Sequence, residues 1–295
     1  MKAVDFDYLR PASLAELCRS LADAAGEAKI IAGGQTLVPL LAMRLARPAL
    51  LLDINRLAEL DGIEEEPDHL VIRAGTRQAA VLRHEAVGRR APLLAKALRF
   101  VGHVQTRNRG TLGGSLANAD PAAEIGLAAL ALDAEIRACS TAGERGIPVT
   151  EFFLGPMTTA LAPEECLTAV RFPEWRAEGG TLGTGFQEVS VRHSDFALAA
   201  AAVQLALDRD GVCRRLALSV GGTGETAVRV AAATERLIGT RLADQDIDAA
   251  AAIVSRSIEG ITDPHASIAY RRRIAGAVAA RALAEARTEA TARTP

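Results

Sequence analysis

The first helical pattern of the chain begins at Ser13. In SLAELCRSLADAAG the leucines recur at helical spacing and form one apolar face. Ser13 can cap the start of this helix, Glu16 can complete a capping box, and Gly26 can end the helix. We therefore expect an amphipathic helix that packs on a core through its leucines.

An apolar run at residues 29–32 (KIIA) predicts a short buried strand that leads directly into Gly33 and Gly34. Helical spacing returns at 38–46 and a second apolar strand follows at 49–55, which gives the order strand, glycine turn, helix, strand. The first N–H groups of such a helix lack helical partners, and its partial positive charge stabilises a nearby anion by roughly 0.3–1 kcal/mol. Because glycine has no side chain, this turn is a candidate phosphate site, although glycine pairs also occur in ordinary turns.

A second glycine turn lies in TRNRGTLGGSLANADPAAE, residues 106–124. An acidic hairpin (63–75) and a helical pattern (80–102) precede it, and a helix with an apolar face follows it. Asp120 suits the N-cap of that helix, and Pro121 suits its first position. Two glycine turns, each followed by a helix, predict a ligand with two phosphates or a pyrophosphate bound from both sides.

Three charged residues of this stretch allow two interpretations each. Asp120 is either a helix cap alone or also a ligand contact. Such a contact must be to a hydroxyl or a ring N–H, because a carboxylate repels phosphate. Arg107 and Arg109 lie either in a solvated loop or against a phosphate.

The C-terminal part begins where glycines cluster, at residues 179–185. Residues 196–207 (FALAAAAVQLAL) fit either a strand or a helix, 214–220 (RRLALSV) predict a strand, and the alanine-rich segments beyond predict helices. The last helix, 268–287, contains three arginines at 271–273. These arginines read as a solvated face or, alternatively, as a surface for a partner.

GTGETA, residues 222–227, matches the G-x-G-x-x-A fingerprint of dinucleotide-binding folds. That fingerprint also needs a second parallel strand that ends in an acidic residue after the helix. The sequence that follows is polar and helical instead. A turn within the C-terminal domain is therefore the better interpretation.

Composition and charge exclude several classes of function. Hydrophobic residues make up 49% of the 295 residues and charged residues 24%, which is typical of a globular protein. With 34 Lys and Arg against 36 Asp and Glu, the net charge is −2, so neither nucleic acid nor an anionic membrane is expected as a partner. No apolar run could span a bilayer, and Asp5 and Asp7 occur where a signal peptide would be apolar, so we expect a cytoplasmic protein.

The four cysteines are far apart in the sequence and form no C-x-x-C pair. Metal or cluster ligation normally needs closer grouping, and cytosolic disulfides are rare. We therefore expect buried cysteines that pack as small apolar side chains, with no metal site and no iron–sulfur cluster in this chain.

The two glycine turns closely resemble a known family. IIAGGQTLVPLLAMRLARP and RNRGTLGGSLANADPAAE are similar to the paired FAD-binding signatures of the medium subunit of molybdenum hydroxylases, the carbon monoxide dehydrogenase and xanthine dehydrogenase group. FFLGPMTTALAPEECLTAVRFP, FQEVSVRHSDFALAAAAV and YRRRIAGAVAARALAEA match the same family in the same order, so the resemblance covers nearly the whole chain. It implies an α+β, PCMH-type FAD-binding fold of two subdomains at residues 1–176, split near residue 56. A smaller α+β domain would follow at 177–288, with a tail at 289–295.

The resemblance also implies a function. In the family, a large subunit hydroxylates the substrate at a molybdenum–pterin centre, and electrons pass through iron–sulfur clusters of a small subunit to FAD on the medium subunit. This chain would then be an oxidoreductase subunit that passes electrons to an external acceptor, and members that use quinone, NAD or oxygen share these motifs. The missing C-x-x-C pairs agree with this division of labour, and no side chain of this chain is expected to be catalytic.

Carried over by motif, the resemblance implies a set of FAD contacts. One side of the pyrophosphate would be wrapped by Lys29, Ile30, Ile31, Ala32, Gly33, Gly34, Gln35, Thr36 and Leu37. The other side would be bound by Gly110, Thr111, Gly113, Gly114 and Ser115, with Val101 and Gly102 nearby. Asp120 would contact the flavin end or the ribityl chain, and Leu161 and Ala162 would lie near the isoalloxazine or the adenine. The flavin ring would be approached by Gln187, where some relatives have lysine, and by the turn at 192–196 with Ser194, Asp195 and Phe196. Covalent attachment of FAD is not implied, although His103 lies close to the second turn.

Two other classes of protein remain open. A stand-alone flavin reductase on the same fold, such as the reductase of enolpyruvyl cell-wall precursors, would need a proton donor beside the flavin, for which Ser115 is available. The match at YRRRIAGAVAARALAEA favours the multi-subunit family instead. A non-enzymatic binding or assembly module would have no reason to keep the glycines of both turns.

Overall fold

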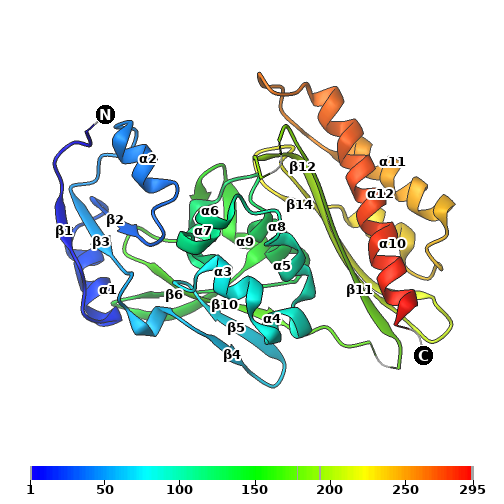
Figure 1. The fold of residues 1–295 in the computed structure, drawn as a ribbon, viewed down its shortest axis with the longest axis horizontal. Coiled ribbons are helices and arrows are strands. Elements are labelled where there is room, and N and C mark those ends of the chain that lie inside the picture. The colour runs from blue at the N-terminus through cyan, green and yellow to red at the C-terminus, as the bar shows by residue number, and fades with distance from the viewer. Residues whose placement is uncertain (1, 178, 193, 294–295) are drawn as a thin grey trace.

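The computed structural model describes residues 2–177, 179–192 and 194–293, so His193 of the expected turn at 192–196 lies outside the described residues. The chain forms three parts that lie in a row (Figure 1). Each part is built on its own sheet, of three, five and four strands in chain order. Helices pack on all three sheets, which confirms the expected α+β class.

The first part is a three-stranded parallel sheet in which β3 lies between β1 and β2. Its elements are β1 (Asp7–Leu9), α1 (Leu14–Asp23), β2 (Ala28–Ile31), α2 (Leu37–Ala42) and β3 (Leu50–Asp53), followed by the 3₁₀ turn η1 (Ala58–Leu60). The expected order of strand, glycine turn, helix and strand is confirmed. Ser13 caps α1 as expected, because its hydroxyl accepts a hydrogen bond from Glu16 N at 3.2 Å. The Glu16 carboxylate instead accepts from the N–H of Ala12, at 2.7 Å, one residue before the cap.

The second part is a five-stranded antiparallel sheet in the order β4-β5-β10-β6-β7. Its strands are β4 (Ile63–Glu65), β5 (His69–Arg73), β6 (Glu135–Ser140), β7 (Gly143–Pro148) and β10 (Cys166–Pro173), with a ribbon of β8 (Phe153–Gly155) and β9 (Thr158–Thr159). Its helices are α3 (Gln78–Arg83), α4 (Glu85–Arg90), α5 (Pro92–Ala97), α6 (Val104–Arg109), α7 (Leu112–Asn118), α8 (Glu124–Ala131) and α9 (Val149–Phe152). The acidic hairpin expected at 63–75 is the β4–β5 pair.

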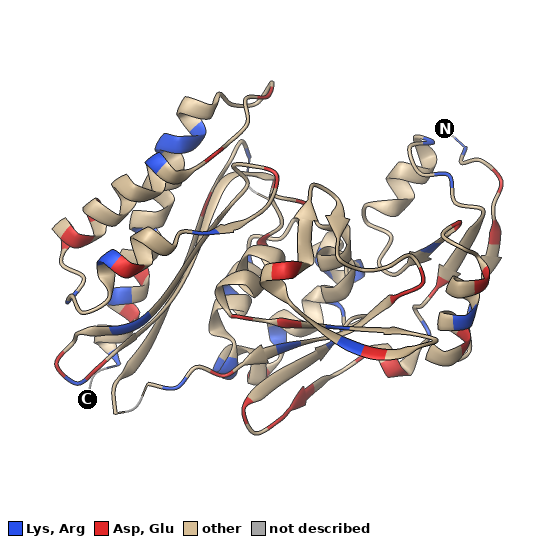
Figure 2. Ribbon diagram, turned by 180° about the vertical axis from the view of Figure 1, so that it is seen from behind, with Lys and Arg blue, Asp and Glu red and all other residues tan. Residues whose placement is uncertain are grey.

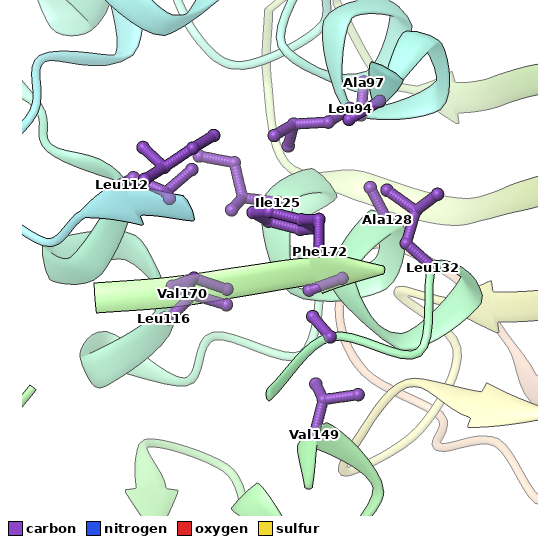
Figure 3. Close-up of a cluster of buried hydrophobic side chains, with 14 of the residues drawn as sticks. Leu94, Ala97, Leu112, Leu116, Ile125, Ala128, Leu132, Val149, Val170 and Phe172 are labelled. Atoms are coloured by element: carbon purple, nitrogen blue, oxygen red, sulfur yellow. The ribbon is translucent and has the colours of Figure 1, made fainter. Parts of the chain in front are cut away.

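Helix α8 lies in the middle of the core of the second part. Every residue from Ile125 to Ala131 is buried, so this helix is apolar on all sides rather than on one face. In Figure 3 the side chains of Leu94, Leu112 and Phe172 gather around Ile125. Phe172 is 1% exposed, and burying such a side chain contributes about 1.5–3 kcal/mol. This core fixes α7, and therefore the second glycine turn, against the sheet.

The third part is a four-stranded antiparallel sheet in the order β11-β12-β13-β14, with helices on one face (Figure 1). Its elements are β11 (Thr181–Ser190), β12 (Ala197–Leu207), β13 (Cys213–Gly221), β14 (Val228–Arg229), α10 (Ala231–Leu237), α11 (Asp244–Ser257) and α12 (Ile268–Ala292). The segment that fitted either a strand or a helix forms β12, and all of its residues are buried. Helix α12 packs close to β11, since a Cβ on Gly183 or Gly185 would lie only 1.9 or 2.0 Å from a carbonyl oxygen of the helix.

The helices differ from the expectations at three points. The pattern at 80–102 forms separate helices, because α3 ends before His84 and Pro92 starts α5 without an N–H to continue an earlier helix. Arg271 is 4% exposed and therefore is not part of a solvated face. Helix α12 runs to Ala292, so the first residues of the expected tail at 289–295 are helical.

The cysteines are free thiols, and three of them are buried as expected. The fold brings Cys18 of α1 to Cys139 of β6, with the two Sγ atoms 3.7 Å apart, and Cys139 is half-buried. Among the described residues, no group of three or more His, Cys, Asp and Glu side chains could hold a metal ion.

Charged residues of both signs occur on each of the three parts (Figure 2). In the part of the chain that the structure describes, none of the helices combines the length and the apolar character needed to cross a membrane.

Candidate functional site

The two glycine turns meet at the junction of the first and second parts. A Cβ placed on Gly33 would lie 2.3 Å from the carbonyl oxygen of Arg109 and 2.8 Å from the Cα of Gly110. Real Cβ atoms essentially never come within 3.0 Å of another heavy atom, so only glycine fits at position 33. The fold thus brings together two motifs that the sequence keeps far apart.

The first turn leaves a run of backbone N–H groups without a protein acceptor. Among the hydrogen bonds of the described residues, none uses the amides of residues 33–37, whereas Val38 N donates to Gly34 O at 3.0 Å. Gly34 has a φ of +69°, a left-handed conformation that favours glycine. Gln35 and Thr36 are exposed. Residues 33–37 therefore offer donors that can bind anionic oxygens from solvent.

The second turn is the start of α7, and its amides already have protein partners. Thr111 is the N-cap, and its Oγ1 accepts from Gly114 N at 3.0 Å. Gly113 N donates to Ala74 O at 2.9 Å, and Ser115 N donates to Thr111 O at 3.2 Å. The expectation of unpaired donors is therefore wrong for this turn. What α7 offers an anion is its partial positive charge and the close approach that glycine allows.

Asn55 and Arg77 connect the two turns, and neither was expected from the sequence. Asn55 Nδ2 donates to Ala32 O at 2.9 Å, and Arg77 Nη2 donates to Asn55 Oδ1 at 2.7 Å. Arg77 Nη1 also donates to the carbonyl oxygen of Arg109. Thr111 lines a polar cavity of about 50 Å³ beside this pair. The available signal was the position of Asn55 after a parallel strand, since side chains that follow such strands gather at one edge of the sheet.

Asp120 lies in a turn between α7 and α8 rather than at a helix N-cap. Its Oδ1 accepts from Ala122 N at 2.9 Å, and its carbonyl oxygen accepts from Ala123 N, the N-cap residue of α8, at 3.0 Å. The expectation that Asp120 is a helix N-cap is therefore wrong, because its carboxylate accepts a hydrogen bond within its own tight turn. The next residue, Pro121, accepts from Gly222 N at 2.9 Å, and this bond joins the turn to the third part.

Arg107 has a structural role that neither of its expected alternatives included. Its Nη1 donates to Val101 O and Gly102 O, at 2.7 Å each, so it fixes the turn before α6. Arg109 is exposed, as a solvated loop residue would be, although it lies at the end of α6. His103 is exposed at the N-cap position of α6.

The third part presents its expected contacts in two places. Gln187 Nε2 donates to Glu285 Oε2 of α12 at 2.9 Å, so its amide is engaged with that helix. Phe196 is 71% exposed in the turn between β11 and β12, which also contains Ser194 and Asp195. Gly222 connects this turn with the Asp120 turn. A Cβ on Gly222 would lie 2.7 Å from the carbonyl oxygen of Ala197, the residue after Phe196.

Leu161 and Ala162 lie between β9 and β10. Leu161 packs against the core of the second part, and Ala162 N donates to Glu165 Oε2 at 2.7 Å. Pro163 follows, and its Cβ lies 3.8 Å from the position of a Cβ on Gly26, after α1. The structure therefore places both residues where the first part meets the second.

Two carboxyl groups with raised pKa values lie between the second and third parts, and neither was expected from the sequence. Burial raises the pKa of Glu124 to about 7, and the charge of Asp120 adds to this rise, while the backbone N–H of Glu124 and the charge of Arg107 oppose it. Burial and the charge of Glu124 raise the pKa of Glu188 to about 8. Glu188 Oε2 is buried and has no hydrogen-bond partner among the described residues. Both groups therefore release their protons at a higher pH than an ordinary carboxyl group does.

This arrangement suits a dinucleotide whose pyrophosphate lies between the turns. The unpaired amides at 33–37 can bind phosphate oxygens. The start of α7 faces them, because Gly33 contacts Arg109 and Gly110, which directly precede that helix. The residues present therefore fit FAD. The chemistry would be the cofactor's, and the protein would bind and orient it.

Comparisons with known proteins agree with this geometry. The FAD binding domain in molybdopterin dehydrogenase matches residues 4–175, and the CO dehydrogenase flavoprotein C-terminal domain matches residues 184–286. The 6-hydroxypseudooxynicotine dehydrogenase complex subunit alpha of Paenarthrobacter nicotinovorans is 40% identical over 97% of this chain and 96% of its own length. The caffeine dehydrogenase subunit beta of Pseudomonas sp. (strain CBB1) is 39% identical over the same shares.

The fold is also that of a solved enzyme. A chain of the carbon monoxide dehydrogenase from Hydrogenophaga pseudoflava, in a form that lacks the Mo-pyranopterin moiety, superposes with a TM-score of 0.94 at 32% identity. The match covers 98% of this chain and 100% of that one. An FAD-binding domain and a flavoprotein C-terminal domain thus follow one another along this chain. The chain belongs to the FAD-binding medium subunits of the molybdenum hydroxylases, which are oxidoreductases.

Proposed function

We propose that this chain is the electron-transfer subunit of a heteromeric molybdenum hydroxylase. It receives electrons from the iron–sulfur clusters of a small subunit, while a large subunit with molybdopterin oxidises the substrate. It passes the electrons to an external acceptor, namely quinone, NAD or oxygen. Bound FAD supplies the redox chemistry. The assembled enzyme works in the cytoplasm.

The observation that supports this proposal best is the run of free amides at residues 33–37, which lies where the two glycine turns meet. The names of the relatives support the proposed partner subunits. Proteins that match this chain almost end to end are named as the alpha subunit of a dehydrogenase complex and as the medium chain of carbon monoxide dehydrogenase. A chain of this composition, matched over its length by subunits, is best understood as one member of such an assembly.

Within this proposal each part of the chain has a task. Residues 1–176, split near 56, bind FAD, with the amides of 33–37 on one side of the pyrophosphate and the start of α7 on the other. Asp120 orients the flavin end. Residues 177–288 bring the turn that contains Phe196 to the ring and separate it from water.

The test compares the chain alone with the chain co-expressed with its partner subunits. Acid precipitation of either sample should release FAD, identified by its mass. Under anaerobic conditions, candidate substrates such as an N-heterocycle, a purine, an aldehyde or carbon monoxide should bleach the flavin absorption only in the complex. Turnover by the chain alone, or the failure of any partner subunit to co-purify, would contradict the proposal.

A further inference from the structure

Arg271 is a buried arginine on α12, two residues before the exposed Arg273 on the same helix. Its Nη1 donates to Leu198 O at 2.9 Å and to Gly222 O at 2.6 Å, and its Nη2 donates to Asp263 Oδ2 at 2.6 Å. A guanidinium that is 4% exposed and makes three bonds is a fixed part of the fold.

Two of the acceptors lie next to segments expected at the flavin end of the FAD site. Leu198 is the second residue of β12, two residues after Phe196. Gly222 opens the GTGETA segment, and its N–H donates to Pro121 O at 2.9 Å, directly after Asp120. One side chain therefore bonds both to the strand that leaves the Phe196 turn and to the turn that contacts the Asp120 turn.

The same geometry accounts for the glycine that opens GTGETA. Gly222 has a φ of +74°, and a Cβ there would lie 2.7 Å from the carbonyl oxygen of Ala197. Glycine is needed here so that the backbone can approach β12 and present its carbonyl oxygen to Arg271 and its N–H to Pro121. The motif thus serves a contact between the second and third parts, through the bond from Gly222 N to Pro121 O.

We propose that Arg271 is a positioning residue for the flavin end of the FAD site. It holds the Phe196 turn and the Asp120 turn in a fixed relation from the far side of the sheet. This inference rests on the proposed function, because it takes those two turns as the ones that approach the flavin.

The contacts of Arg271 predict a selective effect. None of its hydrogen-bond partners belongs to residues 33–37 or to the start of α7. Loss of the guanidinium should therefore weaken the contacts to the flavin and spare those to the pyrophosphate. ADP has the adenosine and the pyrophosphate of FAD but no flavin, so it separates the two ends of the site.

The experiment measures the affinities of the full chain, freed of flavin, for FAD and for ADP. Arg271→Lys keeps the charge and cannot make three bonds in the same geometry. It should weaken FAD binding about tenfold, as expected for one lost charge-assisted hydrogen bond, and change ADP binding by less than about twofold. The visible circular dichroism of bound FAD should change as well, because the surroundings of the ring change. Arg273→Lys, on the exposed side of the same helix, should match the wild type in every measurement.

Equal losses for FAD and ADP would show a general structural role, and unchanged FAD binding with an unchanged flavin spectrum would refute the positioning role. If Arg271→Lys does not fold, Asp263→Asn, which weakens the same guanidinium contact, must show the same split between FAD and ADP. A wild-type chain that binds no FAD would overturn the proposed function itself, and this inference with it.

Discussion

Replacing Gly33 with alanine should separate the two glycine turns. The new Cβ would lie 2.3 Å from the carbonyl oxygen of Arg109, whereas ordinary van der Waals contact begins at 3.4 Å. The shortfall is 3.4 less 2.3, or about 1.1 Å, and the nearest atoms are backbone atoms of Arg109 and Gly110 that no rotamer change can move. The two turns must therefore move apart by about that distance.

The cost of this substitution arises from overlap alone. Gly33 is not among the residues with positive φ, so alanine causes no backbone strain there. Overpacking of this kind destabilises a folded protein by about 1–3 kcal/mol. The midpoint of thermal unfolding should then fall by about 2–12 °C, at the roughly 2–4 °C per kcal/mol that holds for proteins of about 150–250 residues. Bringing the turns back together around FAD should cost a similar amount, which lowers the affinity by about 5- to 150-fold.

The assay is a titration of the flavin-free chain with FAD, followed by the quenching of flavin fluorescence, together with thermal unfolding. Gly88→Ala is the matched control, because this exposed glycine of α4 has no atom within 4 Å of the new Cβ. Alanine at that helical position should raise the stability by about 0.5–1 kcal/mol and leave FAD affinity unchanged. If Gly33→Ala binds FAD as tightly as the wild type, the contact between the turns does not position the site.

Two further substitutions test the contacts between the second and third parts. The pKa values of Glu124 (about 7) and Glu188 (about 8) are raised from an unfolded value of about 4.3, so the folded state binds extra protons and the free energy of unfolding should fall as the pH rises from about 5 to about 8. Glu188→Gln should flatten that decline in thermal melts, and an unchanged slope would count against the assignment. Lys96 donates to both Glu285 and Glu289 at 2.7 Å, so Lys96→Met leaves two like charges together without their donor and should cost about 1–3 kcal/mol. An unchanged melting temperature for Lys96→Met would refute a stabilising role for this cluster.

Elements specified by local signals could be predicted from the sequence. The cap at Ser13 and the strand, turn and helix around Gly33 depend on residues that are neighbours in the chain. Residues 196–207 could not be assigned, because β12 is buried on both of its faces and has no alternation of polar and apolar residues to show its period. Arg271 was misjudged for a related reason, since three consecutive arginines do not reveal which of them faces the sheet.

Only those residues of the candidate site that belong to a sequence motif could be predicted. The two glycine turns could be found as separate segments, but their contact depends on the packing of the first part against the second. Asn55 and Arg77 belong to no motif, and their importance appears only when both turns bond to the same pair of side chains. The raised pKa of Glu188 likewise depends on burial in the folded chain and on the charge of Glu124, a residue from another part of the chain.

The structure also changes how strongly the glycines of the two turns indicate a bound cofactor. A module that had lost FAD was expected to lose the glycines of both turns as well. Yet a Cβ on Gly33 would overlap the backbone at Arg109, and a Cβ on Gly113 would lie 2.5 Å from the Cβ of Ala74. These two glycines are needed for packing, so they would persist whether or not the chain binds a cofactor. The evidence for the cofactor is the set of features that packing does not require, namely the left-handed Gly34 and the free amides of residues 33–37, and a substitution that tests FAD binding without disturbing the fold belongs there.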